Sequence, residues 1–109
     1  MRIEVKGDNS GDVDQSRGRF VISGAISDRG RYVDRDVGSP RDGYFLVRRL
    51  VGAKGTIWIK VGFLEPFPCQ CNWRISKATK AYAGLRGQGH EEGMYRLPVT
   101  LTMTGTVSR

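Results

Sequence analysis

Residues 55–63 read GTIWIKVGF, and their polarity alternates from one position to the next. Successive side chains of a β-strand point to opposite faces of the sheet, so every second residue shares a face. One face of this segment is wholly apolar: Ile57, Ile59, Val61 and Phe63. The other face carries Thr56, Trp58, Lys60 and Gly62. The segment therefore predicts a half-buried strand.

Further strands are predicted on both sides of this one. Residues 44–51 form a β-branched and aromatic run that a three-residue link joins to Gly55, which is the spacing of a hairpin. Alternation predicts additional strands at residues 2–6, 20–27, 71–76 and 94–107, with a brief return strand at 31–33. Clusters of Gly, Asp, Asn and Ser predict loops at residues 8–17 and 34–43 and a turn at 28–30.

The length and composition fit one small β domain. The chain has 109 residues, of which 15 are Gly and 4 are Pro, and it contains no long tract of helix-forming residues. Short antiparallel strands expose sheet edges, and closing the sheet on itself removes those edges. We therefore predict an all-β protein, a small antiparallel closed barrel of about eight strands, formed by residues 1–109 as a single domain.

Two tryptophan strands, a glycine-rich corner and a closing strand follow one another in the C-terminal half: residues 55–59 (GTIWI), 73–75 (WRI), 79–89 (TKAYAGLRGQG) and 101–105 (LTMTG). This order resembles the allene oxide cyclase-like barrel family. The resemblance implies an eight-stranded barrel, allene oxide cyclase-like or lipocalin-like, with a small-molecule cavity. It also implies cyclisation of a reactive, lipid-like substrate, and it transfers no catalytic residue to this chain.

Six side chains are candidates for binding a ligand in such a barrel. Eight strands enclose a space that is either filled by side chains or wide enough for one small ligand. Amphipathic rings could line that space, and an inward Arg could bind a carboxylate with its planar fork. The alternatives are ordinary core packing for the rings and an Arg that reaches the barrel mouth. The candidates are Tyr44, Trp58, Trp73, Tyr82, Tyr95 and Arg48, of which Arg48 is adjacent to Arg49, so that only one of the two points inward.

The charge is unevenly distributed along the chain. Lys and Arg number 18 and Asp and Glu 11, which gives a net charge of +7. Residues 1–43 contain eight groups of each sign, whereas residues 44–109 contain ten basic and three acidic groups. A basic excess attracts an anionic small molecule, a nucleic acid or an anionic lipid surface, or it serves solubility alone.

Other chemistry finds little support in the sequence. His90 is the only His; it is either a general base held by the two glutamates that follow it or a solvated turn residue. Cys69 and Cys71 are too close for an unstrained bridge and predict free thiols, and with one His they supply no zinc ligand set. Residues 8–19 lack the central Gly and the final Glu of a calcium loop. We expect no metal and no cofactor.

Two functions from different classes remain. The first is a small-molecule-binding barrel, an isomerase or cyclase acting on an apolar ligand in its cavity. The second is a basic, OB-like module that binds single-stranded nucleic acid, for which an exposed face carrying Trp58 with Lys60, or Trp73 with Arg74, would be evidence. The apolar face of residues 57–63 leaves a homo-oligomer open. Residues 1–10 lack the apolar core of a secretory signal and no apolar run could span a bilayer, so we expect a cytoplasmic protein.

Overall fold

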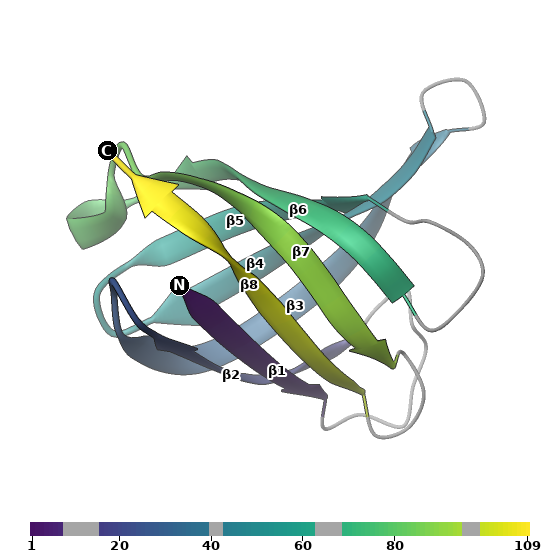
Figure 1. Ribbon diagram of the computed structural model, residues 1–109, viewed down its shortest axis with the longest axis horizontal. Helices are drawn as coiled ribbons and strands as arrows, with labels where there is room; N and C mark the ends of the chain where they lie inside the picture. The colour runs from purple at the N-terminus through teal and green to yellow at the C-terminus, as the bar shows by residue number, and fades with distance from the viewer. Residues whose placement is uncertain (8–15, 40–42, 63–68, 95–98) are drawn as a thin grey trace.

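The computed structural model of the chain is a closed barrel of eight antiparallel strands (Figure 1). It describes all residues except 8–15, 40–42, 63–68 and 95–98, and for 36–39, 43, 44, 69–71 and 94 it describes only the backbone. The strands are β1 (Arg2–Gly7), β2 (Arg17–Ser23), β3 (Asp28–Ser39), β4 (Gly43–Gly52), β5 (Thr56–Gly62), β6 (Cys69–Ala78), β7 (Arg86–Met94) and β8 (Thr100–Ser108), with a 3₁₀ turn η2 (Lys80–Tyr82) between β6 and β7. The predicted fold class is confirmed. In the described part of the chain, no helix has the length and hydropathy that a bilayer crossing requires.

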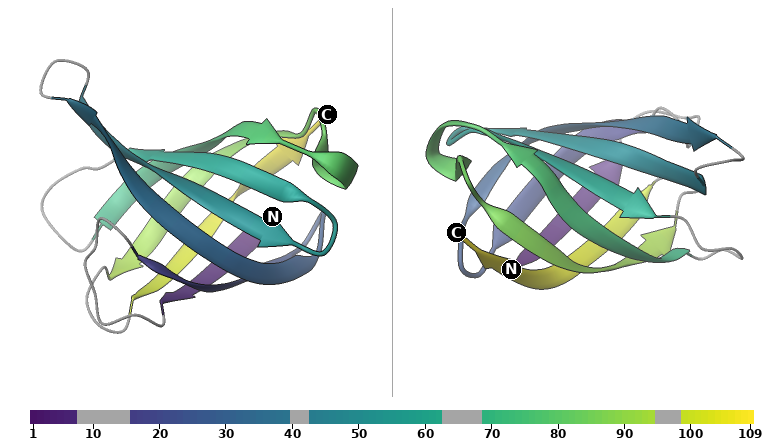
Figure 2. Two further views of the ribbon diagram at one scale, coloured as in Figure 1. Left: turned by 180° about the vertical axis from the view of Figure 1, so that it is seen from behind. Right: turned by 90° about the horizontal axis from the view of Figure 1, so that it is seen from above.

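The barrel closes because the last strand pairs with the first (Figure 2). Each strand pairs with its neighbour in sequence, and β8 returns to β1 in a register that sets Ile3 opposite Met103 and Val5 opposite Leu101. The N-terminal ammonium also donates a hydrogen bond to the carbonyl of Gly105, at 2.9 Å. Closure satisfies the main-chain groups that a first and a last strand would otherwise expose.

Alternate residues of the strands fill the interior with apolar side chains. The predicted apolar face of β5 is part of this core, since Ile57, Ile59 and Val61 are at most 1% exposed. That face is therefore not available as an interface between copies, and Phe63 lies outside the described residues. The buried core consists of Ile3, Val5, Phe20, Ile22, Tyr32, Leu46, Leu50, Ile57, Ile59, Val61, Trp73, Tyr82, Leu85, Val99, Leu101 and Met103.

The first difference from prediction concerns β3, which contains the predicted turn at 28–30 and extends through most of the predicted loop at 34–43. Its twelve residues pair with β4 from Gly30 opposite Gly52 to Ser39 opposite Gly43. The chain reverses earlier, at residues 24–27, where Gly24 adopts a φ of 101° that favours glycine. The polar composition indicated a loop, but a strand tolerates polar residues on the solvent side and, at Asp34, a partner inside the barrel.

The second difference concerns residues 94–107, which do not form one strand. Met94 ends β7 and Thr100 begins β8, and the two residues are register partners in this antiparallel pair of strands. Leu101 and Met103 point inward and are at most 1% exposed. The glycine-rich corner at residues 79–89 is a turn only in its first part, because from Arg86 on it is strand β7. A Cβ atom at Gly89 would lie 1.9 Å from the Thr104 carbonyl oxygen, so glycine permits the close approach of β7 and β8.

A single carboxylate ties together one end of the barrel. Asp28, at the start of β3, accepts hydrogen bonds from its neighbour Arg29, from the N–H groups of Ala53 and Lys54, and from the hydroxyl of Tyr82 at 2.6 Å. Burial alone raises the pKa of Asp28, but these donors outweigh it and hold the pKa below its ordinary value of 3.8. The bonds connect β3 to the β4–β5 turn and to η2.

We expect Asp28→Asn to destabilise the protein by about 1–2 kcal/mol at neutral pH, because an amide nitrogen replaces one acceptor among four donors. A lowered pKa in the folded state means that the stabilisation is complete above the ordinary pKa and is lost as pH falls through the folded value. Thermal unfolding between about pH 5 and pH 2 should therefore show a smaller acid-induced loss for Asp28→Asn than for the wild type. Tyr82→Phe removes one donor and keeps the carboxylate, so this variant should retain most of the wild type's acid-induced loss of stability. The same dependence of unfolding temperature on pH in all three proteins would contradict the role of Asp28.

Candidate functional site

A cluster of charged side chains lies inside the barrel. Arg48 on β4, Asp34 on β3 and Glu91 on β7 are 0%, 2% and 0% exposed. The Arg48 guanidinium binds Asp34 with both a Nε–Oδ1 and an Nη2–Oδ2 hydrogen bond of 2.8 Å. Its Nη1 donates to Glu91 Oε1 and lies 3.2 Å from the sulfur of Met103. The Cζ atom of the Arg48 guanidinium lies over the ring of Tyr32, at 5.7 Å from the centroid of that ring. The cluster thereby links four strands across the interior.

The cluster holds one cation and two carboxyl groups. Burial raises the pKa of Asp34, the hydrogen bonds and charge of Arg48 oppose this, and the neighbouring Glu91 raises it further, so that the net direction is upward. Asp34 therefore binds a proton more readily than a solvated Asp does. A raised pKa in the folded state means that protonated Asp34 favours folding. This contribution of Asp34 to stability is complete below the pKa of an ordinary Asp and is lost as the pH rises through the pKa of Asp34 in the folded protein.

The sequence predicts that one of Arg48 and Arg49 points inward, and in the structure that residue is Arg48. Its planar fork binds a carboxylate in the manner expected, but the carboxylate belongs to Asp34 of the same chain. Arg49 points outward and is exposed. An anionic ligand at Arg48 would have to displace Asp34 or Glu91, so the interior does not offer a ready anion site.

The five aromatic candidates do not converge on one place. Trp73 is buried in the core and donates from Nε1 to the carbonyl of His90, at 3.1 Å. Tyr82 is buried at the end of the barrel, in η2 rather than on a strand, with its hydroxyl on Asp28. Trp58 lies on the outer surface, so it does not line the interior. The side chain of Tyr44 and the whole of Tyr95 lie outside the described residues. Their binding roles stay predictions.

Basic residues line up in rows across the outside of β3 to β6. In one row, cross-strand neighbours run Arg35, Val47, Lys60 and Arg74. The adjacent row runs Val33, Arg49, Trp58 and Lys77. We call the seven outward side chains that combine charge with aromatic rings the basic face: Arg35, Phe45, Arg49, Trp58, Lys60, Arg74 and Lys77. Among the described residues of these two rows, none is acidic.

The basic face is hollowed on both sides of β5. One groove, of about 370 Å³, is lined by Arg35, Arg49 and Trp58 with two valines. A second, of about 470 Å³, is lined by residues that include Phe45, Lys60 and Arg74. The ammonium of Lys60 lies 5.0 Å from the centre of the Phe45 ring, and that of Lys77 lies 5.1 Å from the Trp58 ring. These cations therefore rest on aromatic rings, with their charge at the surface.

Neither a general-base role for His90 nor a metal site gains support from the described residues. His90 is partly exposed, and its Nε2 lies 3.8 Å from the exposed Glu92 carboxylate, which fits the interpretation as a solvated residue. No group of three or more His, Cys, Asp or Glu in the described part of the chain is arranged to hold a metal ion. The side chains of Cys69 and Cys71 and the loop 8–15 lie outside that part.

Asp34 and Glu91 were not predicted as members of the interior cluster. Asp34 stands in a run of Asp and Arg residues that indicated a loop, and Glu91 stands beside another glutamate near the only His. The usable signal was the alternation of side chains along the strand, since Asp34 is two residues from the apolar Tyr32 on the same face.

Comparison with protein-family models, with curated proteins and with solved structures finds no match.

We expect Arg48→Met to destabilise the protein by about 3–5 kcal/mol at pH 7, because it leaves two buried carboxyl groups without their cation. The loss should shrink in acidic buffer, because burial raises the pKa of Asp34 and the loss of Arg48 removes the charge that opposes this, so that Asp34 becomes neutral more readily. Urea unfolding at pH 7 and in acidic buffer measures both effects.

The matched control replaces the whole cluster, as Asp34→Leu, Arg48→Met and Glu91→Leu together. Apolar side chains of similar size often substitute for a buried ion pair at little net cost, so we expect the triple variant to recover to within about 2 kcal/mol of the wild type. A single variant as stable as the wild type at pH 7 would show that the interior charges are not coupled as described.

Proposed function

We propose that the protein binds single-stranded nucleic acid along the basic face. The supporting observation is the cross-strand row of Arg35, Lys60 and Arg74, in which Lys60 and Arg74 are direct neighbours. Like charges placed opposite each other on a sheet are destabilising. An anion that lies against Lys60 and Arg74 relieves this repulsion, and the phosphates of a nucleic acid supply anions at regular spacing.

The arrangement of rings supports a single strand over a compact anion. Trp58 has Lys77 over its ring and also lines the groove between β3 and β5, so bases can reach the tryptophan from the groove. Phe45 is opposite Gly62, four residues along β5 from Trp58, which is about 13 Å at the rise of a strand. Two rings at this separation, with cations between them, suit an extended strand whose bases stack and whose phosphates meet Arg and Lys.

A second candidate is a small-molecule-binding barrel, an isomerase or cyclase of an apolar ligand. The buried pair of Asp34 and Glu91 favours it, because two carboxyl groups in a dry interior, one with a raised pKa, suit acid and base catalysis. The number of strands and the sequence resemblance to the allene oxide cyclase-like barrel family support the same function. We rank it second because the cluster and the apolar side chains occupy the interior, whereas the grooves described above lie on the outside.

We expect a fluorescein-labelled single-stranded oligonucleotide to bind in the low micromolar range at physiological salt, with affinity falling as salt rises. If all five cations of the basic face meet phosphates, the slope of log affinity against log salt should be about −3.5. Arg49→Ala should reduce the magnitude of that slope by about 0.7, whereas Arg2→Ala, which removes an exposed charge from β1 that pairs with Glu4, should leave it unchanged. Fluorescence anisotropy across a salt series provides the measurement.

The aromatic contribution is tested separately by Trp58→Ala. Loss of one stacked base should weaken oligonucleotide binding by about 1–3 kcal/mol at constant salt slope. Trp73, the only other tryptophan, is buried, so a Trp73→Phe variant makes the quenching of Trp58 directly readable. Absence of quenching, together with equal effects of Arg49→Ala and Arg2→Ala, would reject the basic face as a nucleic-acid site. An apolar ligand retained through purification and identified by native mass spectrometry would then favour the second candidate.

A further inference from the structure

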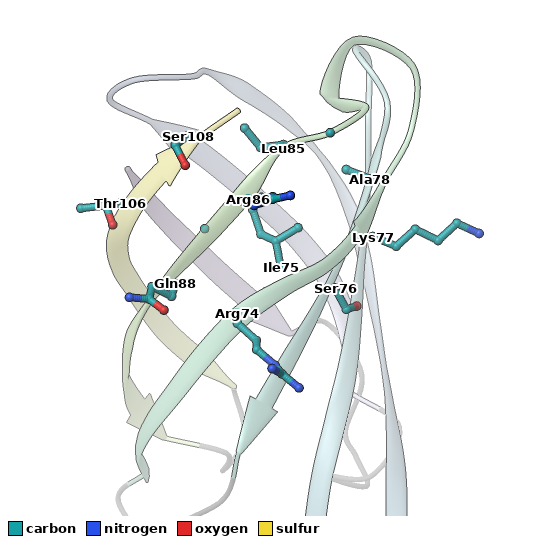
Figure 3. A pocket seen from close by; sticks show the side chains of 12 residues that line it. Arg74, Ile75, Ser76, Lys77, Ala78, Leu85, Arg86, Gln88, Thr106 and Ser108 are labelled. Atoms are coloured by element: carbon teal, nitrogen blue, oxygen red, sulfur yellow. The ribbon is translucent and has the colours of Figure 1, made fainter.

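The barrel has an opening between β6 and β7 at one end. The ladder between these strands ends at Arg74 opposite Gln88. The pairing of β6 with β5 nevertheless continues to Ala78, and that of β7 with β8 continues to Arg86. Figure 3 shows the two strands diverging beyond this point. We call the gap between 75–78 of β6 and 86–87 of β7 the seam.

The seam is a groove with an apolar floor and basic edges. It has a volume of about 720 Å³ and is lined by residues of both strands and of β8. Ile75 and Ala78 pack against the core, and Leu85 is buried, so they form the floor. Arg74 and Arg86 are exposed on the two strands that border it, and none of the described lining residues is acidic.

From these features we propose that the seam binds an extended acidic peptide, which adds a strand along the edge of β6. A sheet edge offers main-chain N–H and C=O groups that recognise an extended peptide through its own main chain. Alternate residues of that peptide would face the floor and the solvent. The floor selects apolar side chains, and the two arginines select carboxylates on the outward positions. The required sequence therefore alternates apolar and acidic residues.

The charge and the open edge together indicate a peptide at this site. Nucleic acid would satisfy the arginines but would not pair with the main chain of 75–78, and it would leave the apolar floor without a partner. The seam also lacks the exposed aromatic rings that carry the proposal for the basic face. The two proposals use largely different parts of the surface, with Arg74 and Lys77 as the residues they share. They can therefore fail independently.

The test uses a fluorescein-labelled peptide of four Val-Glu repeats in an anisotropy titration. We expect saturable binding, with amide hydrogen exchange slowed at residues 76–78 of β6. An analogue methylated on alternate main-chain nitrogens keeps the charge and loses the donors, so it should bind at least about tenfold more weakly. A Val-Lys peptide should not bind.

Charge variants locate the peptide on the protein. Arg86→Glu should weaken binding about tenfold, whereas Arg19→Glu makes the same change of net charge on β2 and should have little effect. Both side chains are exposed, and thermal unfolding verifies that the two variants remain folded. Equal binding of the methylated analogue, equal effects of the two variants, or no binding at all would overturn the proposal. It would also be overturned if Arg86→Glu weakened oligonucleotide binding as strongly as Trp58→Ala does.

Discussion

The pairing of β8 with β1 imposes the constraint on which the rest of the structure depends. Once eight strands close on themselves, every second side chain is enclosed and every other one meets solvent. The interior then has a fixed capacity, which this chain fills with aliphatic and aromatic side chains and with one guanidinium. Arg48 can occupy that space because Asp34 and Glu91 satisfy its donors, and in the described residues no buried side-chain nitrogen or oxygen lacks a hydrogen-bond partner.

Closure also separates the charges of this protein. The carboxyl groups of Asp34 and Glu91 point inward, whereas the neighbouring arginines of the same strands, such as Arg35, point outward. The outside of β3 to β6 is consequently more basic than the composition of the strands suggests. An external anion can therefore be attracted without competition from those two carboxylates, which is the physical basis of both proposed binding surfaces.

The divergence of β6 and β7 shows how a closed barrel can still offer a sheet edge. The carboxylate of Asp28 holds η2 and the β4–β5 turn together, and the chain must cross from that anchored turn back to β7. β6 continues along β5 up to the turn, while β7 joins β8, so β6 and β7 pair with each other only over residues 69–74 and 88–93. Side chains such as Ile75 cover the core at this point in place of a main-chain ladder.

The amino-acid sequence determined the elements whose pattern is local. Alternation at residues 55–63 identified an inward face, because side-chain direction along a strand depends only on the position within that strand. It likewise established that Arg48 and Arg49 point to opposite faces. The length of β3, the division of residues 94–107 between β7 and β8, and the meeting of Arg48 with Asp34 and Glu91 were decided by tertiary structure alone. The three partners are 14 and 43 residues apart in the chain, and only the register of closed strands brings them to one point, since no local preference encodes which distant side chain will share an enclosed space.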